Sequence, residues 1–346
     1  IMISMLKCAI IGCGRIGCGF KDFGDGSIRT HAMAYMKNPQ TELIALCDVD
    51  DSKLKTYSKK FKIKNSYNNH IQMFKELDLD ILSICTLSNT HLKLVRDAAQ
   101  YGIKAIFLEK PISNSLKNTR EIINICKKND IVLTVNHQRR FDSFYSSSLK
   151  NFIHRQIMGT PQLANVHYGG GIANMGSHTF DLLRLLFGDV KSVNANYSKN
   201  RSPNKKDPNL DIELEFENNF KCFLNALDLT NYGIFELDIF GTKGRLKINL
   251  ITNETEYSKI SLKKYQDYKR ISISPLPFSS SKYAGYDISQ GLVDLIKCIK
   301  NNTRPLSSGN EGYKTLELII ACMTSVKQNK KITVPLKKYD YIVHSK

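Results

Sequence analysis

The sequence predicts an α/β protein, with a doubly wound parallel sheet in its N-terminal part and a mostly antiparallel sheet in its C-terminal part. The first 135 residues alternate short apolar runs with amphipathic segments, which is typical of buried parallel strands connected by helices. After Val135 the pattern changes to alternating strands joined by tight turns, such as the one at 217–220. These observations divide the chain into an N-terminal domain at 1–135 and a C-terminal domain at 136–346.

Five short apolar runs predict the strands of the N-terminal sheet, at Leu6–Ile11, Glu42–Cys47, Asp80–Cys85, Lys104–Leu108 and Ile131–Val135. Three amphipathic segments predict helices, at Ser52–Phe61, Thr90–Tyr101 and Leu116–Lys128. An apparent insertion at Cys18–Arg29 delays the first helix until His31. Its glycines and its basic residues, Lys21 and Arg29, favour a flap near an anion, and a solvated surface insertion is the alternative.

The C-terminal part begins with a predicted helix near Phe141–Gln156 and a strand at Gln162–Tyr168. A strongly apolar helix is expected at Ser177–Phe187, with Gly188 as its C-terminal stop. Alternating patterns predict strands at Val190–Tyr197, Leu210–Phe216, Lys221–Leu229, Ile234–Phe240 and Arg245–Asn249. Residues 201–208 and 273–282 are expected to be loops. Two helices close the chain and can pack back on the N-terminal domain, at Ile288–Asn301 and Asn310–Gln328.

The composition excludes several classes of protein. A length of 346 residues suits two domains. The net charge of +18 comes from scattered lysines without a recognisable nucleic-acid module, so no nucleic-acid partner is expected. No apolar run is long enough for a membrane span, and the N-terminus lacks the pattern of a signal peptide. Nine cysteines without a C-x-x-C pair predict buried free thiols and a cytoplasmic location, and no metal site is expected.

Gly12, Gly14 and Gly17 follow the first predicted strand directly, with Arg15 and Ile16 between the second and third glycines. Glycines at this spacing allow a tight turn and let backbone N–H groups approach a pyrophosphate. The segment therefore predicts dinucleotide binding, and a glycine-rich turn that arose by chance is the alternative.

Asp48 ends the second predicted strand. A carboxylate there can accept hydrogen bonds from both hydroxyls of a ribose and repels a 2′-phosphate, which favours NAD over NADP. The alternative is that Asp48 caps the next helix. Thr86, Asn89 and His91 follow the strand at Asp80–Cys85, where the nicotinamide half of the cofactor would pass. Asn89 is equally suited to cap the helix that follows it.

Lys110 lies at the C-terminal end of a predicted strand, in the segment Glu109-Lys110-Pro111. In an open α/β sheet this edge is where cofactor and substrate meet, and a lysine there can hold or deliver a proton. His178 lies at the start of an apolar helix, with Asp181 one turn further on the same face. A lone histidine is more often structural, but hydride transfer from an alcohol needs a proton acceptor. Lys110 and His178 are therefore the predicted catalytic residues.

Gln138, Arg139 and Arg140 follow the last predicted strand of the N-terminal domain, so they are expected to border the substrate cleft. Two adjacent arginines can pair with a phosphate or a carboxylate in a bidentate way, which favours an anionic or nucleotide-linked substrate. The alternative is that either arginine bridges the domains through Asp142 or a backbone carbonyl.

These motifs together resemble the glucose–fructose oxidoreductase/inositol dehydrogenase/MocA (Gfo/Idh/MocA) family over nearly the whole chain. The resemblance implies an N-terminal Rossmann domain and a C-terminal α/β domain with a large open sheet. It also implies a homo-oligomer, a dimer or tetramer, formed through that sheet. The resemblance rests on Gly12–Gly17, Asp48, Asn89-Thr90-His91, Glu109-Lys110-Pro111, Gly176-x-His178-x-x-Asp181 and the segment from Ile296 to Gly312.

The resemblance further implies roles for single residues. Lys110 would contact the substrate and the nicotinamide ribose, and His178 would accept or donate a proton. A carboxylate four residues before this histidine often assists in the family, but this chain has Asn174 there. An amide can hold a substrate hydroxyl, as Asp181 also can, but it cannot take a proton at neutral pH. Further contacts to the cofactor are expected from Thr86, Asn89, His91, Glu109 and Gln138.

The sequence thus predicts an NAD-dependent oxidoreductase that transfers a hydride between nicotinamide and a hydroxyl carbon of a sugar or nucleotide sugar. His178 would take the hydroxyl proton, and Lys110 would orient the hydroxyl and stabilise negative charge on its oxygen. Two alternatives are an NAD-dependent glycosidase that uses transient oxidation and a non-catalytic NAD-binding regulator.

Overall fold

The computed structural model describes residues 5–21, 24–283, 285–337 and 341–344. The chain forms two compact units, the first from Ile1–Phe141 and Tyr286–Lys314, the second from Asp142–Gly285 and Thr315–Lys346. The first unit is therefore larger than the segment 1–135, because it also takes in residues 136–141 and a later segment that contains helix α8.

The first unit contains a sheet of six parallel strands in the order β3-β2-β1-β4-β5-β6. The chain reverses its direction of winding between β1 and β4, and ligands of open α/β sheets bind at such a point. The five predicted strands are confirmed, and the short β3 was missed. The bounds are β1 Leu6–Ile11, β2 Thr41–Cys47, β3 Asn65–Tyr67, β4 Ile81–Ile84, β5 Ala105–Leu108 and β6 Val132–Val135.

Four helices of the first unit, α1, α2, α3 and α5, begin after a residue whose side chain accepts unpaired N–H groups of the first turn. Asp50 caps α2 through the N–H groups of Ser52 and Lys53, and Ser115 caps α5 through the N–H of Asn118. Helix α1 begins at His31, as the insertion predicted. The bounds are η1 Arg15–Gly19, α1 His31–Lys37, α2 Asp51–Phe61, α3 His70–Glu76, α4 His91–Ala99, α5 Leu116–Lys128, η2 Gln138–Arg140 and α8 Ser289–Asn301.

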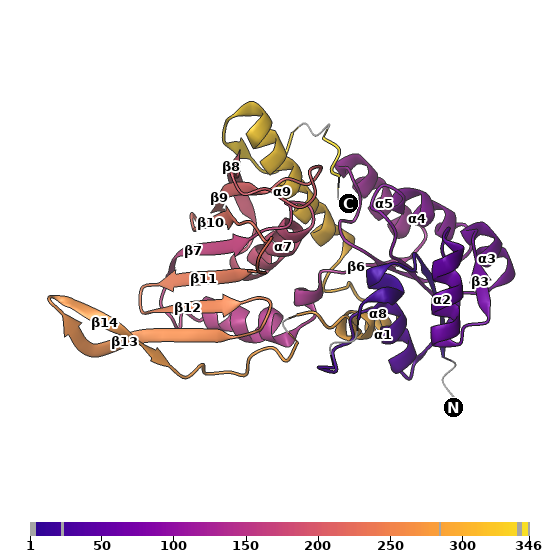
Figure 1. The fold of residues 1–346 in the computed structure, drawn as a ribbon, viewed down its shortest axis with the longest axis horizontal. Helices are drawn as coiled ribbons and strands as arrows, with labels where there is room; N and C mark the ends of the chain where they lie inside the picture. Colours follow the sequence, from indigo (N-terminus) through magenta and orange to yellow (C-terminus); the bar gives the residue numbers. More distant parts are fainter. Residues whose placement is uncertain (1–4, 22–23, 284, 338–340, 345–346) are drawn as a thin grey trace. The chain divides into compact units, whose positions relative to one another are not determined.

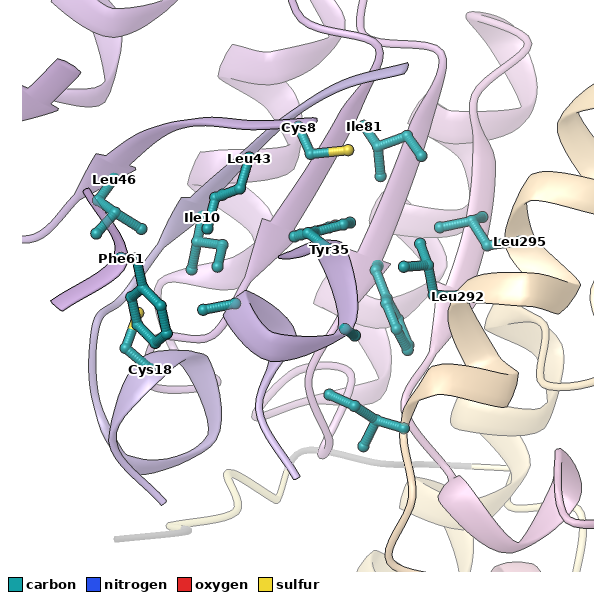
Figure 2. Close-up of a cluster of buried hydrophobic side chains, with 14 of the residues drawn as sticks. Cys8, Ile10, Cys18, Tyr35, Leu43, Leu46, Phe61, Ile81, Leu292 and Leu295 are labelled. Carbon is teal, nitrogen blue, oxygen red and sulfur yellow. The ribbon is translucent and has the colours of Figure 1, made fainter. Parts of the chain in front are cut away.

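The core of the first unit joins segments that lie far apart in the sequence. Ile10 and Leu46 of neighbouring strands, Tyr35 of α1, and Leu292 and Leu295 of α8 are all fully buried in one cluster (Figure 2). Burial of such side chains stabilises each by about 1.5–3 kcal/mol. Helix α8 is therefore part of the first unit, although it follows strands β7–β14 of the second unit in the sequence.

The second unit contains a sheet of nine strands in the order β14-β13-β12-β11-β7-β10-β9-β8-β15. Among the described strands of this second sheet, only β7 and β10 pair in parallel, so the predicted mostly antiparallel sheet is confirmed. The bounds are β7 Pro161–Tyr168, β8 Val190–Tyr197, β9 Leu210–Phe216, β10 Lys221–Ala226, β11 Glu236–Gly241, β12 Gly244–Asn249, β13 Thr255–Tyr265, β14 Tyr268–Ser274 and β15 Ile332–Thr333.

The prediction of one continuous helix near Phe141–Gln156 is wrong, because two short helices of different type lie there. A wide-turned π-helix, η3 at Phe144–Leu149, precedes the short α6 at Lys150–His154. Helix α7, Met175–Phe187, begins two residues earlier than predicted and ends before Gly188, as expected. The closing helix α9 spans Gly309–Gln328.

The hairpin of β13 and β14 was not predicted. It extends as a long arm from one edge of the nine-stranded sheet (Figure 1). Ile260 pairs directly with Ile271, and Ile273 follows two residues later, so all three side chains lie on one face. They are 38, 48 and 74% exposed, and Leu262 is fully exposed. The hairpin therefore presents an apolar surface to solvent.

Candidate active site

The glycine-rich loop after β1 is shaped by two close approaches of the backbone. Gly12 has a φ of +98°, and a Cβ there would lie 2.7 Å from the carbonyl carbon of Cys85, just beyond β4. A Cβ on Gly17 would lie 2.1 Å from the carbonyl oxygen of Gly12. A side chain at either position would push the loop away from the point between β1 and β4 where the winding reverses.

The space beside Gly14 is open among the described residues, because a Cβ there would meet none of them within 4 Å outside its own chain neighbours. Gly14 precedes η1, and its carbonyl accepts the N–H groups of Cys18 and Gly19. The Arg15 guanidinium lies over the Phe20 ring, 4.7 Å from its centroid. An open backbone at the start of a helical turn, at the carboxyl edge of a parallel sheet, fits the pyrophosphate of a dinucleotide.

Asp48 follows β2 and holds the same loop. Its Oδ2 accepts a hydrogen bond from the Cys13 N–H at 2.7 Å, and its Oδ1 accepts one from the Asp50 N–H at 3.0 Å. The cap of α2 is Asp50, so the interpretation of Asp48 as a helix cap is wrong. Each carboxylate oxygen has a second lone pair, so Asp48 can also accept hydrogen bonds from a ribose.

His91 connects the loops that follow β4 and β5. Its ring is fully buried, with Nε2 3.1 Å from the Thr86 carbonyl and Nδ1 3.1 Å from the Ile112 carbonyl. Burial lowers the pKa of His91, and a neutral ring can donate to only one of these carbonyls at a time. Asn89 is exposed, and Thr90 is the cap residue of α4, so the interpretation of Asn89 as the cap is wrong.

Lys110 follows the end of β5 by two residues, as predicted, and is half-buried beside a buried carboxylate. Glu109 accepts hydrogen bonds from Asn136 Nδ2 at 2.6 Å and the Lys110 N–H at 3.2 Å, and its Oε1 lies 3.0 Å from His31 Nε2. Burial opposes ionisation, but the His31 contact, Asn136 and the Lys110 charge together hold the pKa of Glu109 below its ordinary value. Glu109 is therefore an ionised carboxylate at this edge of the sheet.

The residues after β6 form the short helix η2, and all three side chains are buried. Arg140 Nη2 lies 3.0 Å from a carboxylate oxygen of Glu311, and the Arg139 guanidinium lies 5.4 Å from the centroid of the Tyr286 ring. Both partners belong to the first unit. Part of the Arg140 charge is therefore already compensated by the protein, and Gln138 lies in the same buried turn.

In the second unit, His178 lies in the first turn of α7 and is half-buried, while Asp181 one turn further is almost fully buried. Asn174 is the residue that precedes this helix. The loop before the helix is held by the buried Asp207, whose carboxylate accepts the Ala173 N–H at 2.7 Å and the Asn174 N–H at 2.9 Å. Asp207 therefore fixes the start of the helix that carries His178.

The end of the insertion is tied to the first unit. Arg29 forms an ion pair with Asp25 at 2.7 Å, and its guanidinium lies 5.3 Å from the centroid of the Tyr286 ring. The Ile28 carbonyl accepts the Ile288 N–H at 2.9 Å. Residues 22 and 23 lie outside the described residues. These contacts pack residues 28 and 29, at the C-terminal end of the insertion, against the rest of the first unit, and the flap stays a prediction.

Sequence reasoning missed the partners behind Glu109. His31 Nδ1 lies 2.7 Å from Ser83 Oγ, and the Tyr35 hydroxyl lies 2.6 Å from the same Ser83 oxygen. The only sign of these partners in the sequence was a polar residue, Ser83, inside the apolar run that forms β4. Asp207 was likewise missed because it stands in a loop rich in Pro, Ser and Asn.

The cysteines behave as small buried residues, as predicted. All nine are free thiols, and all but Cys85 are buried. Burial raises the pKa of Cys47 and Cys126 to about 12, so both stay protonated near neutral pH. Across the described residues, no three histidine, cysteine or acidic side chains gather where they could hold a metal ion. In the same part of the chain, every helix is too short or too polar to cross a lipid bilayer.

Both parts of the chain match models of known protein families. Residues 6–137 match the GFO_IDH_MocA model, an oxidoreductase family with an NAD-binding Rossmann fold. Residues 158–336 match the model of the C-terminal alpha/beta domain of that oxidoreductase family.

Two curated proteins match nearly the full chain. D-apiose dehydrogenase of Paraburkholderia graminis is 25% identical over 94% of this chain and 89% of its own length. Myo-inositol 2-dehydrogenase of Thermotoga maritima is 24% identical over 94% of this chain and 98% of its own length. Among solved structures, the WlbA dehydrogenase of Bordetella pertussis, in complex with NADH and UDP-GlcNAcA, has a TM-score of 0.77 at 20% identity, covering 96% of this chain and 100% of that one.

Proposed function

We propose, from the premise that this chain belongs to the GFO_IDH_MocA family of NAD-binding oxidoreductases, that it oxidises a hydroxyl group of a free sugar or polyol. The observation that carries the proposal is the pair of Glu109 and Lys110, an ionised buried carboxylate next to a lysine at the carboxyl edge of an NAD-binding sheet. The two curated relatives that match nearly the full chain are dehydrogenases of apiose and myo-inositol by name.

The first unit has the residues that would hold NAD. The open backbone at Gly14 would receive the pyrophosphate, and Asp48 would accept the hydroxyls of the adenosine ribose. The loops that carry Thr86, Asn89, His91 and Gln138 would border the nicotinamide half. When bound, NAD supplies the hydride acceptor.

Lys110 and His178 divide the work on the substrate hydroxyl. Lys110 donates a hydrogen bond to the hydroxyl oxygen and stabilises the negative charge that develops as the O–H bond breaks. The imidazole of His178 accepts that proton. Asn174 and Asp181, at the start of the same helix and one turn beyond His178, hold neighbouring hydroxyls of the substrate, the first through an amide that does not titrate.

A nucleotide sugar is the second candidate substrate, and the adjacent Arg139 and Arg140 favour it. Arg140 already forms an ion pair with Glu311, and Arg139 lies over Tyr286, which favours the uncharged substrate instead. The two candidates differ in charge, so ionic strength separates them.

The substrate class is tested by a matched comparison of free sugars and inositols with nucleoside-diphosphate sugars, followed as NADH formation by absorbance. We expect higher kcat/KM for an uncharged substrate, with little change as salt is raised. A higher kcat/KM for the nucleotide sugar, which falls as salt is raised, would instead indicate that Arg139 and Arg140 bind the charged group of the substrate. Release of an aglycone without net NADH would instead indicate a glycosidase, and tight NAD binding without any turnover would indicate a regulator.

We also propose a homo-oligomer formed through the C-terminal sheet, with the exposed isoleucines of the β13–β14 hairpin in the contact. A contiguous apolar surface on a sheet edge is commonly covered in an assembly. Serine at both Ile271 and Ile273 is expected to lower the mass measured by light scattering during size-exclusion chromatography. Serine at Ile157, which is 48% exposed outside the hairpin, serves as the matched control. A wild-type protein that is monomeric at all concentrations would contradict this proposal.

A further inference from the structure

A continuous chain of hydrogen-bonding groups lies behind Lys110. It runs from the Tyr35 hydroxyl to Ser83 Oγ at 2.6 Å, from there to His31 Nδ1 at 2.7 Å, and from His31 Nε2 to Glu109 Oε1 at 3.0 Å. Tyr35, Ser83 and His31 are at most 1% exposed. The chain ends where Glu109 Oε2 accepts the backbone N–H of Lys110. It therefore connects α1 and β4 to the segment that carries the lysine.

One direction of donation satisfies every member of this chain. An ionised Glu109 can only accept, so His31 must donate from Nε2. The Tyr35 hydroxyl has no other acceptor than Ser83 among the described residues, so Tyr35 donates to Ser83. Ser83 then donates to His31 Nδ1, which must be unprotonated. In this arrangement His31 accepts a hydrogen bond from Ser83 at Nδ1 and donates one from Nε2 to Glu109, which carries the negative charge at the end of the chain.

Lys110 is the group that balances the negative charge of Glu109, because three other groups near this carboxylate are uncharged. Asn136 is neutral, burial raises the pKa of the Cys85 thiol, and burial lowers the pKa of His91, so none of these is charged near neutral pH. The charge of Lys110 lowers the pKa of Glu109, and by reciprocity the carboxylate favours the ammonium form of the lysine.

We propose that His31 and Glu109 are positioning residues for Lys110. Glu109 fixes the backbone of the lysine through the N–H group and balances its ammonium group, and His31 keeps Glu109 ionised and oriented. This inference rests on the function proposed above for Lys110, and its tests include measurements that need no turnover.

The link between Glu109 and Lys110 is tested by competitive labelling of amines with trace acetic anhydride across a pH series, with peptide mass spectrometry. We expect Glu109→Gln to lower the apparent pKa of Lys110 by about one unit or more, because an opposite charge is removed. Lys104 is the internal reference, since it pairs with Asp80 at the other end of β5 and its pKa should not move. An unchanged Lys110 pKa would overturn the proposal whatever the activity.

The role of His31 is tested by two substitutions. His31→Leu removes the donor, so the infrared band of a protonated carboxyl group should report a Glu109 pKa raised by about one unit or more. His31→Gln keeps an amide N–H near the position of Nε2, so it should restore the wild-type value. The band is assigned by its loss in Glu109→Gln; if that variant does not fold, ¹³C-labelled glutamate assigns it by its isotope shift. A Glu109 pKa unchanged in His31→Leu would remove His31 from the proposal.

The activity of the His31 variants links the chain to the reaction. A carboxyl group with a raised pKa loses its charge earlier as pH falls, so the acid limb of kcat/KM should move to higher pH in His31→Leu and return in His31→Gln. His70→Gln is the matched control. His70 Nε2 lies 2.8 Å from Asp97 Oδ2 in a similar pair, and this pair does not include Glu109 or Lys110. Labelling shifts without any effect of Lys110→Ala on turnover would support this inference and contradict the proposed function.

Discussion

Replacing Lys110 with alanine is expected to lower kcat by roughly 10²–10⁴-fold, while the fold is retained. The substrate oxygen would lose the donor that stabilises its developing negative charge. His178→Ala should lower kcat on the same scale, since the hydroxyl proton would lose its acceptor. Steady-state kinetics measures kcat, thermal unfolding checks the fold, and a fluorescence titration measures the affinity for NAD.

A double variant shows whether the two residues act on one hydroxyl group. If they do, Lys110→Ala and His178→Ala together should cost far less than the product of the two single effects. Lys104→Ala is the control, because Lys104 precedes β5 at the opposite edge of the sheet and is exposed. Near-normal turnover of His178→Ala would move the proton acceptor elsewhere, with Asp181 as the next candidate.

Alanine at Gly17 is expected to weaken NAD binding by at least about 100-fold, equal to about 2.7 kcal/mol, and to lower the unfolding temperature. Its Cβ would lie 2.1 Å from the Gly12 carbonyl oxygen, so the loop must move even without cofactor. Gly14→Ala should separate the two effects. Its Cβ meets open space in the protein, so the unfolding temperature should hold while NAD affinity falls.

Isothermal titration with NAD and differential scanning calorimetry measure both quantities. Gly233→Ala is the control, because within the described part of the chain its Cβ would meet only a side-chain atom of Ile251 at an ordinary 3.6 Å, and neither quantity should change. A Gly14→Ala protein that binds NAD as tightly as the wild type would place the pyrophosphate elsewhere than over this glycine.

Long elements with one buried face could be predicted from the sequence. The bounds of α5, β8 and β9 agree with the predicted ones residue for residue, because burial imposes a regular spacing on their apolar positions. The three-residue β3 is too short and polar to give such a signal. Strands β13 and β14 were missed because most of their side chains are exposed, so neither strand has the buried apolar face that a half-buried strand shows in its sequence.

The same distinction applies to the candidate site. The glycines of the phosphate loop and the position of Lys110 are local features, which can be read from a strand and the residues that follow it. The pairing of His31 with Glu109 joins residues 78 positions apart, and Asp207 holds residues 33 and 34 positions away. Such partners are set by the folded arrangement of several elements, and no local pattern specifies which polar side chains will meet.

Asp48 limits how readily the cofactor preference of this chain could change during evolution. The carboxylate proposed to select NAD also accepts the N–H of the fully buried Cys13. A substitution that merely removes the charge, such as Asp48→Ala, would leave that N–H without an acceptor at a cost of about 1–3 kcal/mol. A viable path to NADP would therefore start through Asn or Ser, which shed the charge and keep an oxygen, so the order of mutations matters as much as their identity.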